Sequence, residues 1–503
     1  MWIFKKIKTM KNFIKNFNFV TLQDIFFRNT GTKQTIAKNT FWLGLSELSI
    51  NLLKFALFIY AAKVLGDVGF GQFAFVSSFV AIFGIFFDFG LSEALTREFA
   101  KEVRNEQDTA TLFSLQVFIS VLVGALLSIA SFFVSTKVGN VQSAVLIMGG
   151  YMFIANLQTF FYAVFRARQK MQLEFFPNFL QNLAITGFGF LLLYKLQTVT
   201  SLSLAYFLGV LLAFGPTMLY FHRNVAPLRL HFDKKLWTKF LRISCPLALV
   251  GIVSMAIYNN IDSIMLGFFG QIKENGWYSA AYRIVTFSIL PMVFVYQSFF
   301  PALATAFNQS KEKMQQLWET QLQIFIFLGL PIFFGGYALA DSLISFLYPK
   351  EFHPSVSIFK ILIFITFFIY LYMPFKQILV IFNQQNKIFW LFFFGMLINI
   401  GLNLFTIPHF SLYGAAISTL VAQLFVFIGL MYLSAKKTHM RAITPRVVGV
   451  FCCSLIASIM MFSVLNLMNS TVNVFLLVGM RVIVYLVVFF IEFLISVMRP
   501  FLK

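Results

Sequence analysis

Fourteen mostly apolar stretches follow one another from Thr40 to Met498, each about as long as a bilayer crossing. A transmembrane helix needs about 20 apolar residues to cross about 30 Å of hydrocarbon. Hydrophobic residues make up 59% of the chain and charged residues 11%, a balance unlike that of soluble globular domains. The sequence therefore predicts an all-α polytopic membrane protein with about 14 transmembrane helices.

The connections between these stretches are short. The expected spans are 40–65, 70–92, 112–135, 141–165, 175–194, 200–221, 243–269, 278–307, 321–348, 355–381, 388–408, 412–433, 446–467 and 473–498. The sequence holds no GxxxxGK[ST] loop to bind ATP, and no HExxH, CxxC or GxSxG motif. We therefore expect no enzyme, no metal site and no cofactor, but a protein that moves a substrate across the bilayer.

The net charge of +21 is concentrated on one side of the predicted membrane. If the N-terminus is cytoplasmic, inside connections hold clusters such as Arg166, Arg168 and Lys170, whereas outside connections hold about one basic residue or none. This asymmetry is the positive-inside rule, and it predicts that both termini are cytoplasmic. It accounts for the charge without a nucleic-acid partner. The basic segment 1–39 is expected to be a partly disordered tail or an amphipathic segment on the inner leaflet.

The first six spans and the next six resemble two copies of one unit. Phe165-Arg-Ala-Arg-Gln-Lys170 corresponds to Phe382-Asn-Gln-Gln-Asn-Lys387, and Gly71-Gln-Phe-Ala74 corresponds to Gly276-Trp-Tyr-Ser-Ala280. Two such copies predict two six-helix lobes around a central cavity, with two C-terminal helices added. The expected division is a first lobe over 40–221, a basic cytoplasmic linker over 222–242, a second lobe over 243–433, and a C-terminal part over 434–503.

Ionisable residues inside the spans are candidates for function, because a charge at mid-bilayer costs about 2.5–3.5 kcal/mol on insertion scales. The candidates are Glu47 and Lys54 in span 40–65, Asp88 in span 70–92, Asp262 in span 243–269, Arg283 in span 278–307 and Lys376 in span 355–381.

Two of these charges lie on one face of the first span. Glu47 and Lys54 are two helical turns apart, with Asn51 between them, so this face is expected to line a wet cavity. Lys54 then attracts an anionic substrate, or else pairs with Glu47. Lys376 is expected to contact substrate in a helix bent at Pro374, or to extend its amine toward the inner surface.

Arg283 has two alternative functions. Its planar guanidinium suits phosphate oxygens, so it is a candidate for substrate contact. It is also predicted to lie at a depth similar to that of Asp262, with which it would form a structural ion pair. The carboxylates Glu47, Asp88 and Asp262 are candidates for ion coupling or for charge pairs.

Four motifs carry a resemblance to a known family. They are Thr40-Phe-Trp through Leu65-Gly-Asp-Val-Gly-Phe-Gly-Gln-Phe73, Phe87-Asp-Phe-Gly-Leu-Ser-Glu-Ala-Leu-Thr-Arg-Glu98, Asn260-Ile-Asp-Ser-Ile-Met-Leu-Gly267 and Tyr278-Ser-Ala-Ala-Tyr-Arg283. With these motifs the chain resembles the bacterial O-antigen and capsule flippases of the multidrug/oligosaccharidyl-lipid/polysaccharide exporter superfamily.

The resemblance implies a V-shaped pair of lobes in the bacterial inner membrane. It implies a polyprenyl-diphosphate-linked oligosaccharide as substrate, moved to the outer leaflet by alternating access for lipopolysaccharide or other surface polysaccharide, with polysaccharide polymerases as further partners. By motif position Arg283 is the first candidate for binding the diphosphate. Arg97, at the inner mouth, is the second, or else only follows the positive-inside rule. A H⁺ gradient, a Na⁺ gradient or the membrane potential is expected to drive turnover.

Three rival functions remain. A cation-coupled multidrug antiporter of the same fold would have a cavity dominated by carboxylates, whereas acids and bases are about balanced here. Lipid II flippases of this superfamily carry more arginines in the first two spans, where this chain has Lys54 and Asp88. A membrane glycosyltransferase would need a larger loop than any of the short connections between the predicted spans of this chain.

Overall fold

The structure, a computed structural model, describes residues 32–101, 106–258, 261–438 and 440–466. These residues form long helices and no strand, which confirms the predicted all-α class. Ten helical stretches among them are long and apolar enough to cross a membrane. The predicted span 473–498 and most of the segment 1–39 lie outside the described residues, so the number fourteen stays a prediction.

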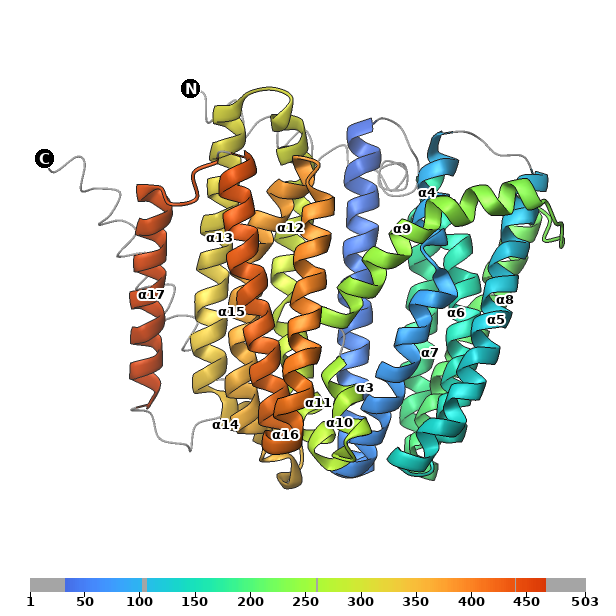
Figure 1. The fold of residues 1–503 in the computed structure, drawn as a ribbon, viewed down its shortest axis with the longest axis horizontal. Coiled ribbons are helices and arrows are strands. Elements are labelled where there is room, and N and C mark those ends of the chain that lie inside the picture. Colours follow the sequence, from blue (N-terminus) through green and yellow to red (C-terminus); the bar gives the residue numbers. More distant parts are fainter. Residues whose placement is uncertain (1–31, 102–105, 259–260, 439, 467–503) are drawn as a thin grey trace, which may run out of the picture.

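The first group of helices corresponds to the predicted first lobe. It contains α3 (Thr32–Asp88), α4 (Leu91–Lys101), α5 (Glu106–Val138), α6 (Gln142–Ala167), α7 (Gln172–Leu196) and α8 (Val199–Asn224). Helices α7 and α8 pack along each other, α6 packs on α8, and α3 packs on α5, α6 and α7 (Figure 1).

The second group corresponds to the predicted second lobe. It contains α11 (Ile272–Ser288), α12 (Leu290–Phe307), α13 (Lys311–Ala338), α14 (Ala340–Leu347), the 3₁₀ turn η1 (Lys350–Phe352), α15 (Ser355–Ile381) and α16 (Gln385–Thr438). Helix α15 packs on α11, α13 and α16, and the additional helix α17 (Pro445–Asn466) packs on α13 (Figure 1).

Two of the long helices each contain a sharp turn. Gly66 in α3 has a φ of 68° and Ser411 in α16 a φ of 53°, so neither residue is helical. Glycine adopts such a positive φ without the steric cost that a Cβ would bring. These turns lie between the predicted spans 40–65 and 70–92, and between 388–408 and 412–433, so each long helix is a pair of predicted spans.

The linker between the lobes is packed against the first lobe. It continues into α9 (Lys234–Tyr258), which crosses obliquely over the first lobe and is followed by α10 (Ile261–Phe268) (Figure 1). The Trp237 Nε1 donates to the carbonyl of Thr111 at 3.0 Å, and the His231 backbone N–H donates to the Ser114 hydroxyl at 2.8 Å. The predicted span 243–269 contains the later part of α9 and all of α10, and residues 259–260 between them lie outside the described residues.

The molecule has two ends. We call the end with α4 and the first turns of α9 the basic end, and the end with the turns at Gly66, Gln271 and Ser411 the hairpin end. At the hairpin end the Ser411 hydroxyl donates to Gln271 Oε1 at 2.8 Å, which joins the turns of the second lobe to each other.

Candidate substrate and coupling sites

The two lobes are in direct contact at the hairpin end, along α3 and α11. Gly71 and Gly276 approach so closely that a Cβ on Gly71 would overlap the carbonyl oxygen of Ile272, and one on Gly276 would overlap that of Asp67. The Asn275 side chain, which is fully buried, donates to the carbonyl of Gly71 at 2.8 Å. Only glycine permits this backbone contact, which closes the space between the lobes here.

Polar and ionic contacts surround this glycine contact. Lys273 Nζ lies 3.6 Å from Asp67 Oδ2, although the lysine side chain is 53% exposed. The carboxylate of Glu351, in η1, lies against Gly66. We call the contact between α3 and α11 near Gly71 and Gly276 the hairpin seal.

Lys54 and Arg283 lie at similar depth on either side of the α3–α11 contact. Lys54 precedes Gly66 in α3 and Arg283 follows Gln271 in α11, each by about 18 Å of helix at 1.5 Å per residue. Two cations at similar depth on helices that pack against each other form an environment that favours an anion.

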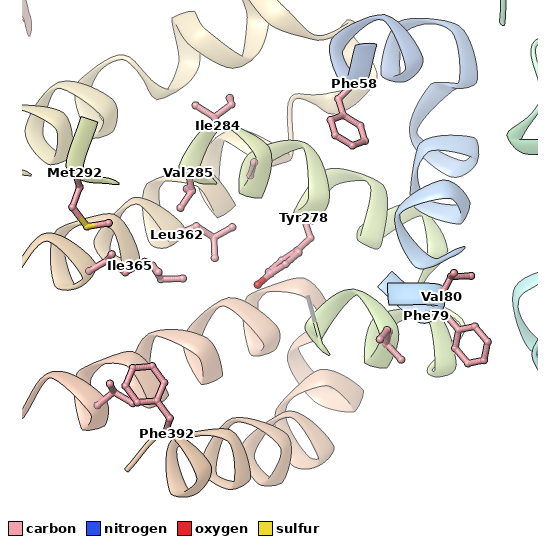
Figure 2. Close-up of a cluster of buried hydrophobic side chains, with 14 of the residues drawn as sticks. Phe58, Phe79, Val80, Tyr278, Ile284, Val285, Met292, Leu362, Ile365 and Phe392 are labelled. Atoms are coloured by element: carbon pink, nitrogen blue, oxygen red, sulfur yellow. The ribbon is translucent and has the colours of Figure 1, made fainter. Parts of the chain in front are cut away.

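Arg283 is stacked on an aromatic ring of the opposite lobe. Its guanidinium carbon lies 3.7 Å from the centroid of the Phe58 ring on α3. In Figure 2 the Phe58 ring projects from α3 into the cluster of buried side chains that α11 shares. Within the described part of the chain, Arg283 has no carboxylate partner within 4 Å.

Glu47 is exposed and interacts mainly with its own helix. The Asn51 amide donates to the Glu47 carbonyl at 2.7 Å and to its carboxylate at 3.4 Å. Among the described side chains the alternative Glu47–Lys54 ion pair is not formed within 4 Å, so Lys54 keeps its charge uncompensated at contact distance.

Asp262 lies among hydrogen-bond donors in the second lobe. The hydroxyls of Tyr278 and Thr419 each donate to Asp262 Oδ2 at 2.6 Å. The Asn403 amide donates to Oδ1 at 2.7 Å, and the Asn399 amide reaches the same oxygen at 3.4 Å. These donors come from α11 and from both halves of α16. The structure thus gives Asp262 this set of donors in place of the ion pair with Arg283.

Asp262 and the four side chains that donate to it form a buried site rich in oxygen. Each of them is at most 5% exposed, and Figure 2 shows Tyr278 extending from α11 toward the two helices of α16. The side-chain oxygen of Asn403 is also buried but accepts no hydrogen bond from the described residues. Carboxylate, amide and hydroxyl oxygens are the ligands that hard cations prefer. This arrangement can hold a small cation or a proton.

Asp88 and Arg97 lie at the basic end. The Asp88 carboxylate accepts from the backbone N–H of Ser92 at 3.3 Å and also from its hydroxyl, at the start of α4. This position resembles a helix cap. The Arg97 side chain is 66% exposed and lies 3.8 Å from the carboxylate of its neighbour Glu98. Neither residue lies near Lys54 or Arg283 along the helices.

Lys376 is half-buried in α15, away from the α3–α11 contact. Its Nζ lies 5.2 Å from the centroid of the Phe392 ring in α16. Two residues before Lys376, the carbonyl of Pro374 accepts a hydrogen bond from Trp318 Nε1 at 3.1 Å. Trp318 belongs to α13, so this hydrogen bond joins α13 to α15.

Several residues of these sites were not identified from the sequence. Asn403 and Thr419 gave no signal beyond being polar residues in apolar spans, and Asn399 was noted only for its place in the repeat. Phe58 gave none, because 70 phenylalanines are spread through the chain. Arg166, counted as a positive-inside residue, instead binds the buried Glu174 through two hydrogen bonds, one of them 2.7 Å from Nε to Oε2.

Comparisons with known proteins agree with this fold. The family whose sequence model matches is described as "Polysaccharide biosynthesis protein", and the match covers residues 36–307, more than half of the chain. No curated protein matches the sequence.

Similar solved structures are transporters. The lipid II flippase MurJ in an inward closed conformation has a TM-score of 0.73 and 17% identity, covering 91% of this chain and 99% of that one. An inward-facing multidrug resistance MATE family transporter of the MOP superfamily has a TM-score of 0.59 and 15% identity, covering 78% and 99%. A MOP superfamily transporter from Pyrococcus furiosus has a TM-score of 0.54 and 14% identity, covering 80% and 96%. At these identities the likeness establishes the fold alone, which this chain shares with these transporters.

Proposed function

The chain belongs to the polysaccharide biosynthesis protein family, and from that premise we propose that it is a flippase for a polyprenyl-diphosphate-linked oligosaccharide. The flippase moves the lipid-linked sugar from the inner to the outer leaflet of the bacterial inner membrane, for assembly of O-antigen or another surface polysaccharide. Both termini lie in the cytoplasm, so the hairpin end faces outward. Polysaccharide polymerases that use the flipped lipid are the expected partners.

The observation that carries the proposal is the pair of cations between the lobes. Lys54 and Arg283 lie at similar depth on two helices that pack together, and neither has a carboxylate within 4 Å among the described residues. A diphosphate between them compensates both charges, and its oxygens match the planar fork of a guanidinium. Since the hairpin seal lies beyond them, the substrate reaches this pair from the cytoplasmic side.

Arg97 and Lys376 serve the same substrate less directly. The exposed side chain of Arg97 at the basic end attracts the diphosphate as it leaves the inner leaflet. Lys376 lies near the inner end of α15, where its amine is within reach of the phosphate or sugar groups at the mouth. Asp88 holds the start of α4, which carries Arg97, and so acts through the position of that helix.

Asp262 couples transport to a cation. Its carboxylate, the side-chain oxygens of Asn399 and Asn403 and the hydroxyl of Thr419 lie in one buried cluster, which fits Na⁺ better than a large organic cation. Binding of Na⁺ there holds α10 against both halves of α16, and so biases the second lobe. A H⁺ gradient or the membrane potential is the alternative driving force.

A cation-coupled multidrug antiporter is the second candidate. It is favoured by the buried carboxylate of Asp262 and by the MATE-like fold, but it leaves Lys54 and Arg283 without a function, because two cations repel a cationic drug. A lipid II flippase is less well supported, since the first two spans carry Lys54 and Asp88 where arginines would be expected. A membrane glycosyltransferase lacks support from the fold.

The lipid-linked sugar pool in cells without this protein tests the proposal. We expect undecaprenyl-diphosphate oligosaccharide to accumulate on the inner leaflet, as probed with an impermeant enzyme, and surface polysaccharide to be lost. Arg283→Ala should give the same defect at normal membrane levels, and Arg283→Lys should restore little, because an amine offers no bidentate contact. An unchanged pool with new sensitivity to cationic drugs would instead establish the antiporter.

A further inference from the structure

We propose that Phe58 is a positioning residue for Arg283: the ring, on one lobe, completes the anion site on the other lobe only while the hairpin end is closed. Opening of the hairpin end then removes the ring and dismantles the site, which releases the substrate outward. The proposal rests on the flippase function proposed above. It adds a reason why the affinity for the anionic substrate differs between the closed and the open hairpin end.

The first step is the geometry of the guanidinium. A separation of 3.7 Å between the guanidinium carbon and the ring centroid places the cation directly over the face of Phe58. A cation in this position is attracted by the quadrupole of the ring. The N–H groups of a guanidinium lie in its plane and point outward from its edge. The ring therefore fixes the plane of Arg283 and leaves the edge available to two phosphate oxygens.

The second step is that the ring is itself held in place. Phe58 is 7% exposed. Its ring meets those of Phe70 and Phe73, from the second half of α3, with centroids 6.5 Å and 6.1 Å away. Phe70 in turn meets Phe352 of the second lobe, 5.9 Å away, beside the hairpin seal. The position of the ring is thus tied to closure of the hairpin end.

The third step is thermodynamic. Phe58 and Arg283 belong to different lobes, so separation of α3 from α11 at the hairpin end breaks their contact. If the anion binds best when the contact is formed, the anion must stabilise the closed hairpin end by the same factor. A flippase that captures its substrate from the cytoplasm and releases it outside needs such a difference in affinity.

The experiment uses the full chain in nanodiscs, with undecaprenyl diphosphate as the probe. We expect Phe58→Leu and Phe58→Met to weaken binding by about 3- to 30-fold, the range expected for loss of a cation–π contact at a desolvated site. Phe58→Tyr keeps a ring face and should bind within about twofold of the unmodified chain. Two ring-deleting variants are included in case one of them does not fold.

Phe55→Leu is the matched control. Phe55 also lies on α3 and stacks across the lobes, on Phe287 of α11 with centroids 4.6 Å apart, but this pair contains no cation. Its loss costs packing in the same contact between lobes, so binding should change by less than about twofold. Equal weakening by Phe55→Leu and Phe58→Leu would assign the effect to packing alone and overturn the proposal.

A second readout follows the lobes themselves. Spin labels at Gln197 and His353, both exposed at the hairpin end on different lobes, report its opening. Undecaprenyl diphosphate should increase the short-distance population in the unmodified chain and in Phe58→Tyr, but not in Phe58→Leu. An equal increase in Phe58→Leu would overturn the proposal. Failure of the unmodified chain to bind the probe would instead overturn the flippase function.

Discussion

Asp262 illustrates how neighbouring side chains decide what a charge in a membrane can do. Its carboxylate accepts four hydrogen bonds in a buried site and has no cationic partner among the described residues, whereas Arg283 rests on a ring. An anion of this kind is compensated only in part by neutral donors, so the site gains most from a bound cation. Arg283 is in the opposite situation and gains most from a bound anion.

The first prediction concerns Asp262. A ligand that binds only the folded state raises its stability, so Na⁺ should raise the thermal unfolding midpoint of the purified protein relative to choline at equal ionic strength. Asp262→Asn keeps the size of the side chain and should abolish this Na⁺ effect. Asp262→Ala should also lower the midpoint without Na⁺, because each buried donor left unsatisfied costs about 1–3 kcal/mol.

The Asn399→Leu variant is a useful comparison, since it removes one amide and leaves the carboxylate in place. It should weaken the Na⁺ effect without eliminating it. If Asp262→Asn responds to Na⁺ as the unmodified protein does, Asp262 is not the coupling residue. If Na⁺ leaves the thermal unfolding midpoint of the unmodified protein unchanged, coupling to H⁺ or to the membrane potential replaces the proposed coupling to Na⁺.

At the scale of helices, the hairpin turns are what bring the lobes together. Gly66 allows α3 to reverse direction, and Gly71, one turn and a half further on, lets α11 approach as closely as backbone atoms permit. Close approach at small residues is a general feature of helix contacts in membranes, where lipid offers no hydrophobic driving force. The seal is therefore sensitive to one methyl group.

The second prediction tests this sensitivity. In Gly71→Ala the new Cβ would overlap the carbonyl of Ile272, which cannot rotate away, so α3 and α11 must separate. We expect the label distance between Gln197 and His353 to shift toward the open population. Gly187→Ala is the control, because nothing lies within 4 Å of its added Cβ in α7. A Gly71→Ala distribution identical to that of Gly187→Ala would contradict the seal.

Most of the helices could be predicted from the sequence, and the reasons are physical. Lipid forces each span to be a long apolar run, and Gly66 interrupts such a run with a residue suited to a turn. The partners of Asp262 were not predictable, since Thr419 is 157 residues away in sequence and only packing of the lobe brings it close.

For the whole molecule, the internal repeat is visible in the contact between lobes. Gly71 and Gly276 occupy corresponding positions in the two copies, and in the structure the backbone of each lies against the other. Residues near a two-fold axis contact their own equivalents, so this pair marks the local axis between the lobes. In the proposed opening the lobes separate at this contact, which parts Phe58 from Arg283 and keeps the Asp262 site, because that site lies within one lobe.

The third prediction concerns the orientation of the whole molecule. The basic end should face the cytoplasm, because clusters of Lys and Arg are retained inside during insertion. In a variant whose three cysteines are replaced by serine, single cysteines at Gln197 and His353 should react with an impermeant maleimide added to intact cells. Cysteines at Lys170 and Lys235 should react only after the cells are permeabilised. The reverse labelling pattern would place the hairpin seal on the cytoplasmic side. Substrate would then reach Lys54 and Arg283 from outside the cell. A flippase for surface polysaccharide must instead take its substrate from the cytoplasmic side, so this result would contradict the proposed function.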